Sequence, residues 1–471
     1  MIYLTKWGLA ALIVLAPLPL GANRPWSWSL LCLGVGVCLL LWTAAAMGNR
    51  GVIRMPSRRY GAFTILYGLL ILWFLIQAAT FTPQAWHHPL WDQVRTAFSN
   101  GDSITIRSSI SLDREATLAG VMRLLAYGCI FWLALQFGRS RNGANRMLWA
   151  VAAAAFVYGV YGLVVRFANL QTLLWYDKWA YQDSVTGPFV NRNSFATYVG
   201  IGLLVTLVLA WREFGRPTAS GLAGGQKVRA VMAQIRPRIF VLIGMAATLA
   251  TALLLTGSRG GIAATLAGGL VLILALIAVH RHWLAVAAVA AIVMGGTLVL
   301  GAVGLDRLEG RIAAMPVEAQ HRAALHAQSI TAIGDRPIFG TGLGTYRDTY
   351  NLYKDYRLPF WTLPTDKAHN SYLELAVEGG LPALAILLMV FGLVVLRCLV
   401  GLFRRRQELA LPALGLAVTA LVGAHAVVDF SMQIPAIAAT YAYIMGVACA
   451  QSWPTQAERA TAALGSTERL P

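Results

Sequence analysis

Residues 381–403 read LPALAILLMVFGLVVLRCLVGLF, a long apolar run whose only charged member is Arg397. An apolar run of about 20 residues can cross a bilayer as a helix, because a helix pairs its backbone groups within the segment. Similar runs recur along the chain and predict an all-α, polytopic membrane protein with about 12 transmembrane helices. The predicted spans are 5–22, 29–47, 61–80, 116–137, 147–168, 195–211, 239–256, 261–279, 283–304, 381–403, 409–428 and 435–451.

Composition agrees with this prediction. Of the 471 residues, 58% are hydrophobic and only 12% are charged, about half the usual share for a soluble protein. These values argue against a soluble globular enzyme. The net charge of +18 does not indicate nucleic-acid binding, since the charges lie in short breaks between apolar runs rather than in a basic domain.

The basic residues instead predict orientation. Placing the N-terminus in the cytoplasm puts most of the excess Lys and Arg on the cytoplasmic side and leaves the outer side nearly neutral. Both termini are then cytoplasmic, and the long outer loops are 81–115, 169–194 and 305–380. The predicted domains are transmembrane helices 1–9 (1–304), a large outer loop with short helices (305–380), helices 10–12 (381–451) and a cytoplasmic tail (452–471).

Two further features concern the spans themselves. The first 22 residues fit either a cleaved signal peptide or, as we favour, an uncleaved first helix, because the second span follows at once. All five cysteines lie within predicted spans, without a spacing typical of zinc ligands or disulfides.

A glycine-rich turn, Thr256-Gly-Ser-Arg-Gly-Gly261, connects two predicted spans on the outer face. The next helix begins there, and its N-terminal dipole and free N–H groups favour an anion. Ser258 can cap this helix and Arg259 can bind phosphate. The turn therefore predicts a diphosphate site, and a hairpin with one solvated arginine is the alternative.

A second outer motif, Asn191-Arg192-Asn193-Ser194, precedes the span at 195–211. Arg192 at a helix start could bind phosphate, and the flanking amides could bind a sugar. The alternative is an N-cap made by Asn193 or Ser194, with Arg192 in solvent.

A third motif, Lys367-Ala-His-Asn-Ser-Tyr-Leu-Glu374, closes the largest outer loop. The spacing of Ser371 and Glu374 is typical of a capping box, so it predicts a short helix from about Ser371 to Gly379-Gly380. His369 then lies just before a helix N-terminus, where the local field favours the neutral imidazole that a general base needs. Glu374 or Glu378 could orient it or hold a sugar hydroxyl.

Several other residues are weaker candidates for binding a substrate or a metal. Arg123 and Arg166 lie within predicted spans, where charged groups are candidates for substrate binding, although snorkelling is the simpler explanation. The pair His87-His88 with Asp92 is interpreted as interfacial rather than as a metal site. An aromatic set could stack on sugars or form an interfacial belt, which we favour. This set contains Tyr346, Tyr350, Tyr353, Tyr356 and Trp361.

In this order and on one face, the motifs resemble the O-antigen ligase and polysaccharide polymerase family of membrane glycosyltransferases. Residues 334–344, GDRPIFGTGLG, also resemble that family's large-loop signature, and the resemblance is specific from about 185 to 385. Two positions depart from the ligase pattern. Ala383 replaces a Gly, Thr or Tyr, and His326 replaces a Trp four residues after Arg322. These departures favour a polymerase over a lipopolysaccharide ligase.

The resemblance implies an undecaprenyl-diphosphate-linked glycan as donor and a saccharide or lipid A-core as acceptor, at the periplasmic face of the bacterial inner membrane. It implies that Arg192 and Arg259 hold the diphosphate and that His369 is the catalytic base, the roles that residue chemistry also favours. No cofactor or metal is expected, and a chain-length regulator is a candidate partner. The candidate substrate-binding residues are Asn191, Asn193, Ser258, Asn370, Glu374, Arg166 and Arg123.

Two other functions stay open from the sequence. A transporter or flippase of lipid-linked saccharides would share the basic outer turns. However, all 20 acidic residues lie outside the predicted spans, whereas ion-coupled transporters usually keep a carboxylate at membrane depth. A scaffold role would leave the clustered outer motifs unexplained.

Overall fold

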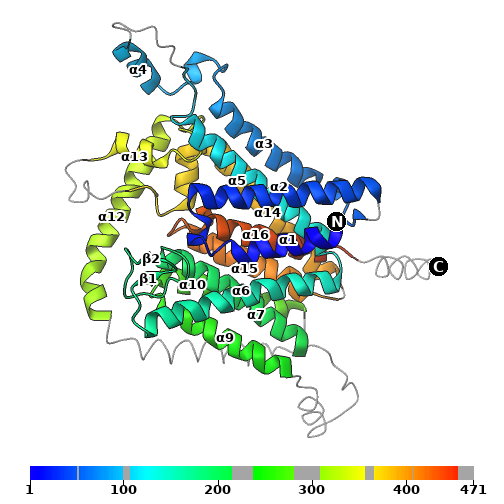
Figure 1. Cartoon of the computed structure of the whole chain (residues 1–471). Coiled ribbons are helices and arrows are strands. Elements are labelled where there is room, and N and C mark those ends of the chain that lie inside the picture. Colours follow the sequence, from blue (N-terminus) through cyan, green and yellow to red (C-terminus); the bar gives the residue numbers. More distant parts are fainter. Residues whose placement is uncertain are drawn as a thin grey trace.

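The protein is a bundle of long helices with α4 (Leu90–Phe98), α12 (Leu308–Asp335), α13 (Tyr346–Tyr353) and a small hairpin gathered at one end (Figure 1). This computed structural model describes residues 1–49, 52–98, 107–214, 237–279, 308–355, 365–405 and 407–454. The described chain is mostly helical, as the all-α prediction requires. It also contains one small antiparallel hairpin, β1 (Thr172–Leu173) and β2 (Tyr176–Asp177), which that prediction omitted.

The long apolar helices account for most of the predicted spans. They are α1 (Ile2–Leu15), α2 (Pro25–Gly48), α3 (Gly61–Ala78), α5 (Arg114–Phe137), α6 (Arg141–Phe167), α7 (Arg192–Phe214), α9 (Pro237–Leu255), α10 (Arg259–Val279), α14 (Ser371–Arg404), α15 (Ala410–Ala426) and α16 (Pro435–Gln451). Each overlaps one predicted span, while the span at 283–304 lies outside the described residues.

Within the described chain, 8 helices are long and apolar enough to cross a membrane. Two more apolar helices, α1 and α15, are shorter. The chain is therefore a membrane protein, while the count of about 12 spans and the orientation of the termini stay predictions.

The core of the bundle lies around α7 and α16. Every residue of α16 is buried, and α5 packs along it. Glycines make the closest approaches possible: a Cβ added at Gly446 would lie 2.5 Å from the carbonyl oxygen of Phe131, and one at Gly268 would lie 2.7 Å from that of Ala417. Small residues at such crossings are typical of helix packing in membranes, because they let the backbones touch.

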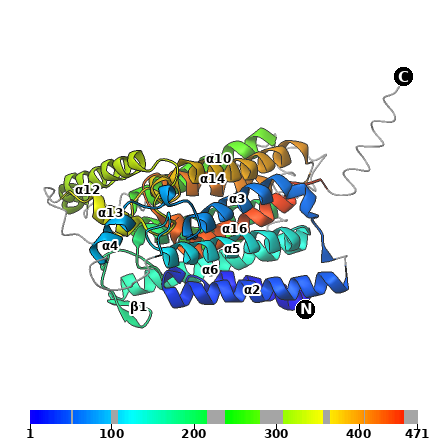
Figure 2. The ribbon, with the colours of Figure 1, turned by 90° about the horizontal axis from the view of Figure 1, so that it is seen from above.

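The elements that connect the predicted spans at one end of the bundle lie together, opposite the N-terminus (Figures 1 and 2). We call this the loop end. It contains α4, α12, α13 and the β-hairpin, which come from the three segments predicted as long loops. The remaining short elements are η1 (Leu20–Ala22), η3 (Ser57–Tyr60), η4 (Gln84–Trp86) and η6 (Ser431–Gln433).

The large loop is attached to a break in α14. The sequence predicts a short helix ending near Gly379-Gly380 and a new span opened by Pro382; the structure joins both as α14, with Gly380 non-helical at φ 72°. A Cβ at Gly380 would lie 2.1 Å from the carbonyl oxygen of Ile338, and Leu381 N donates to Pro337 O at 2.7 Å. The loop signature at 334–344 therefore attaches to this break through backbone contacts.

Candidate active site

His369 and Asn370 directly precede α14. The φ of His369, 51°, is in the left-handed region, which turns the chain sharply just before the helix. Asn370 is the N-cap, since its Oδ1 accepts hydrogen bonds from Tyr372 N and Leu373 N, both at 3.0 Å. The predicted helix start at Ser371 is confirmed, but the predicted capping box is wrong because the cap lies one residue earlier.

The partner of His369 is Asp429, which the sequence did not single out. Asp429 follows α15, and its Oδ1 lies 3.4 Å from His369 Nδ1, a distance that allows an ion pair. Asp429 is buried, and the His369 side chain is 26% exposed, so the imidazole can still reach a substrate. The ring of Phe430 meets the imidazole edge-on at 5.1 Å between centroids. A carboxylate and an aromatic ring thus fix the orientation of His369.

Glu374 serves the backbone around His369 rather than the imidazole. Its carboxylate accepts a hydrogen bond from Ala368 N at 2.9 Å and pairs with Lys367 Nζ at 3.1 Å. Glu378 is also turned inward, where it accepts from Tyr346 N at 3.1 Å. The prediction that one of these glutamates orients His369 is therefore wrong. Glu374 instead holds the two residues that precede the histidine.

Arg192 begins α7 at the same end. The helix is capped by Asn191, whose Oδ1 accepts from Asn193 N at 2.7 Å, rather than by Asn193 or Ser194 as the alternative proposed. The Arg192 guanidinium lies 5.2 Å from the ring centroid of Tyr181. Its Nε is buried and has no hydrogen-bond partner in the described part of the chain. A buried cationic donor without a partner is costly, so a bound anion would stabilise it.

Arg259 begins α10, as the sequence predicts. Ser258 caps the helix, with its Oγ accepting from Gly261 N at 3.1 Å. Thr256 Oγ1 accepts from Ser258 N at 3.1 Å, and Gly257 has a φ of 64°, so the turn needs its glycine. The Arg259 side chain is exposed at the helix N-terminus. Both arginines therefore add their charge to a positive helix end.

The first turns of α7 and α10 lie side by side. A Cβ added at Gly261 would lie only 2.5 Å from the Cβ of Ala196, so the residue one turn after Arg192 touches the residue two positions after Arg259. One turn further along, the same test at Gly200 gives 2.3 Å to Thr265 Oγ1. The two arginines thus begin adjacent helices at one level of the bundle.

A buried histidine, His425 in α15, joins these helix starts to the His369–Asp429 pair. Its Nδ1 lies 2.7 Å from Thr197 Oγ1 of α7 and 3.0 Å from Ser431 Oγ of η6. On α10, a Cβ at Gly260 would lie 3.4 Å from His425 Nε2. The arginine-bearing helices and the segment that carries Asp429 therefore pack around one side chain. Like Asp429, His425 has no sequence motif, and only its place at the outer end of a predicted span hinted at a role.

The charges around Asp429 keep its carboxylate ionised beside His369, which suits a histidine that accepts a proton. Burial alone would raise the pKa of Asp429, but His369, His425 and the backbone N–H of Phe430 hold that pKa below its ordinary value. Asp429 is thus an anion at neutral pH. Helix α12 brings a second imidazole, His326, whose pKa is lowered by burial and by the positive charges of Arg322 and His369.

The structure gives the other two arginines different surroundings. Arg123 of α5 donates to Ala119 O of its own helix at 3.3 Å and lies 5.6 Å from the ring centroid of Trp28. Arg166 lies in the last turn of α6, where its charge helps to lower the pKa of Lys178 after the effect of burial. No contact described here places either arginine beside His369.

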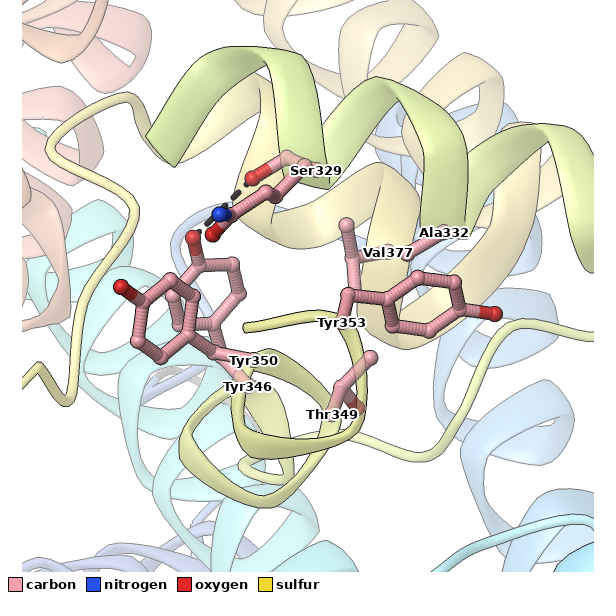
Figure 3. A pocket seen from close by; sticks show the side chains of 8 residues that line it. Ser329, Ala332, Tyr346, Thr349, Tyr350, Tyr353 and Val377 are labelled. Atoms are coloured by element: carbon pink, nitrogen blue, oxygen red, sulfur yellow. Dashed lines mark hydrogen bonds between the residues drawn. The ribbon is translucent and has the colours of Figure 1, made fainter. Parts of the chain in front are cut away.

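The tyrosines of the large loop form a small core (Figure 3). Tyr346, Tyr350 and Tyr353 lie on one helix, α13, as their spacing predicts, and the first two rings stack at 6.4 Å. Tyr346 Oη lies 3.0 Å from Ser329 Oγ of α12. The cavity beside them holds about 10 Å³, room for about one water molecule and too small for a sugar. Neither sugar stacking nor an interfacial belt describes them; Tyr356 and Trp361 lie outside the described residues.

The histidine pair near α4 has separate partners. His87 lies 2.8 Å from Ser108 Oγ through Nδ1 and 3.0 Å from Thr82 Oγ1 through Nε2, while His88 Nδ1 accepts from Leu90 N at 3.2 Å. In the described part of the chain, no three His, Cys, Asp or Glu side chains are grouped so that they could hold a metal ion.

A bundle of apolar helices with two arginine-bearing helix starts beside a histidine–aspartate pair defines a membrane protein with a polar site at one end. Residues 244–388 match the family model described as O-antigen ligase. This match supports the resemblance to the O-antigen ligase family, and the matched segment contains Arg259 and His369. Such a match points to glycosyltransferase-like activity in a membrane, with a lipid-linked glycan and a saccharide acceptor in general. No curated protein matches the chain.

Proposed function

We propose that the protein transfers an undecaprenyl-diphosphate-linked glycan to a hydroxyl of a saccharide acceptor. The observation that carries this proposal is the His369–Asp429 pair beside the helix starts of Arg192 and Arg259. The pair supplies a base, and the helix starts supply positive charge for a diphosphate. The family match supports glycosyl transfer in general, and the donor and acceptor are parts of the proposal.

The chemistry is a single displacement. The acceptor oxygen forms a bond to the anomeric carbon, its proton passes to His369, and the bond from that carbon to the diphosphate oxygen breaks. Asp429 keeps the imidazole oriented and stabilises the imidazolium as it forms. Arg192 and Arg259 stabilise the charge that develops on the leaving diphosphate. Attack opposite the leaving group inverts the anomeric centre. The scheme assigns no step to a metal or cofactor, because the arginines offset the leaving-group charge.

Asn193, Ser258 and Asn370 have more limited roles in this proposal. Ser258 and Asn370 cap the helices, as does Asn191, so each fixes a neighbouring arginine or histidine. Asn193 lies at the start of α7, where its amide can face a sugar. We place the site at the periplasmic face of the inner membrane, because the basic residues gather in loops of the opposite side.

Substitution of the site residues tests the mechanism. His369→Ala and Arg259→Ala should each abolish or strongly reduce glycan transfer in membranes that contain equal amounts of protein. Arg238→Ala is the matched control, because Arg238 is also an exposed arginine in the first turn of an apolar helix, α9, but at the opposite end of the bundle. Full transfer by either site variant would disprove the mechanism.

Polymerase and ligase differ in the intermediate that accumulates. The gene for this protein is deleted and the lipid-linked saccharides that accumulate are analysed by mass spectrometry. Single repeat units are expected if the protein is a polymerase, which we favour. Long lipid-linked chains are expected if it is a ligase. Lipid flipping by the reconstituted protein without any new glycosidic bond would instead support the alternative of a flippase.

A further inference from the structure

A second polar group of residues lies at the end of the bundle opposite the active site. It surrounds a cleft of about 250 Å³ between η3, α3, α5, α14 and the end of α16. Arg397 and His369 are separated by most of α14, on the order of 35–40 Å at 1.5 Å per residue. This cleft therefore belongs to another part of the molecule. Its lining residues include Arg59, Tyr60, Phe63, Phe131, Arg397 and Trp453.

Two cations and one indole form the polar end of the cleft. The guanidinium of Arg397 lies 3.9 Å from the ring centroid of Trp453, and that of Arg59 lies 5.1 Å from it. Trp453 Nε1 donates to Tyr60 Oη at 2.6 Å, which fixes the indole. Two guanidinium groups around one ring repel each other, so an anion between them would be stabilising.

The described chain satisfies the hydrogen-bond donors of Arg397 only in part. Its Nη2 donates to the carbonyl of Ser452, but its Nε is buried and has no hydrogen-bond partner in the described chain. An arginine in an apolar span is costly unless it is paired, and it usually marks a binding site. No acidic residue is among the described residues that line the cleft. The described lining of the cleft therefore supplies positive charge without a balancing carboxylate.

The rest of the cleft is apolar and opens toward lipid. Phe63 and Phe131 stack at 4.6 Å and form its wall. Leu396 lines it and is 56% exposed, and Phe403 continues the same helix at 66% exposed. In a helix that crosses the membrane, such exposed apolar residues face acyl chains. A ligand for this cleft thus needs one anionic end and one hydrocarbon end.

We propose that this cleft binds an acidic phospholipid. The phosphate lies between Arg397 and Arg59, and one acyl chain lies along Phe63, Phe131 and Leu396. Basic pockets between transmembrane helices recognise acidic lipid headgroups by this combination of charge and apolar contact. The lipid would bridge α3 to α14 and to the end of α16.

Lipid titration of the purified protein in neutral detergent tests the proposal. Phosphatidylglycerol should bind, observed as retained lipid in native mass spectrometry, with at least tenfold preference over phosphatidylcholine. Arg397→Gln should reduce phosphatidylglycerol binding at least tenfold. Arg58→Gln is the matched control and should leave binding unchanged, because Arg58 is an exposed arginine of η3, beside Arg59, and does not line the cleft.

A second variant keeps the test decisive if Arg397→Gln does not fold. Ala62 lines the cleft and is exposed, so Ala62→Phe should fill the acyl-chain path without touching Arg397. Selective binding that survives in Ala62→Phe, or equal binding of the two phospholipids by the unmodified protein, would overturn the proposal. So would displacement of phosphatidylglycerol by equimolar undecaprenyl phosphate, since the cleft would then be a site for the isoprenoid carrier.

Discussion

Replacing Asp429 by Asn isolates the contribution of the histidine–aspartate pair. The substitution keeps the size and the hydrogen-bonding shape of the side chain but removes its charge. Two unit charges 3.4 Å apart interact by about 5 kcal/mol at an effective dielectric constant of 20. His369 is partly exposed, and its Nδ1 forms no hydrogen bond with Asp429 in this arrangement. We therefore expect the carboxylate to stabilise the transition state by about half of this energy.

A loss of about 2–3 kcal/mol corresponds to a decrease of roughly 30- to 150-fold in the rate of transfer. The rate should be measured under single-turnover conditions in membranes, with the protein in excess over the lipid-linked oligosaccharide donor. Asp335→Asn is the matched control. Its carboxylate is also at the loop end, but it accepts a hydrogen bond from Tyr353 Oη at 2.8 Å and does not contact the site.

If Asp429→Asn transfers glycan within threefold of the unmodified protein, at equal protein levels, the carboxylate does not assist His369. If Asp335→Asn loses as much activity as Asp429→Asn, the effect reflects general damage to the loop end rather than the loss of the ion pair.

Three further predictions follow from packing and charge. Gly261→Val should force α10 away from α7, because its Cβ would lie 2.5 Å from that of Ala196; transfer should fall at least tenfold and the unfolding temperature should drop, whereas Gly269→Val, with nothing within 4 Å of its added Cβ, should have little effect on either. Lys367→Met should leave the buried Glu374 unpaired and lower the free energy of unfolding by about 1–3 kcal/mol, less than for a fully buried pair because Lys367 is partly exposed; unchanged thermal stability would contradict this. Finally, the pKa of Asp429 is depressed from 3.8, so its stabilising effect is complete above about pH 4 and is lost as the pH falls through the lower folded-state pKa; the stability difference between the protein and Asp429→Asn should shrink only in that acidic range.

The helices could be predicted because their signal is local. An apolar run bounded by charges needs no knowledge of its neighbours, and the helix starts at Arg259 and Ser371 were predicted from their capping residues and glycines. Even here, local patterns misled where two residues could cap the same helix: Asn370 rather than Ser371 caps α14.

The partners within the site could not be predicted in this way. Glu374 stands five residues from His369 in sequence, and Asp429 stands beyond an intervening pair of helices, yet Asp429 is the partner. Helix packing decides which carboxylate meets the imidazole, and the sequence does not state how α14 and α15 pack. The tyrosines of α13 illustrate the same limit: their spacing predicts a shared face, but only packing against α12 shows that the face is buried.

The distance along the chain between Arg192 and Asp429 has a consequence for biogenesis. Ribosomes add roughly 5–20 residues per second, so the first arginine is made on the order of 10–50 seconds before the aspartate. In the proposed mechanism, the two arginines that would hold the diphosphate are made first, then the base His369, and last the carboxylate of Asp429. Under that mechanism, a nascent chain would be able to bind a carrier lipid before it can transfer the glycan, and transfer would begin only once the hairpin of α15 and α16 is in place.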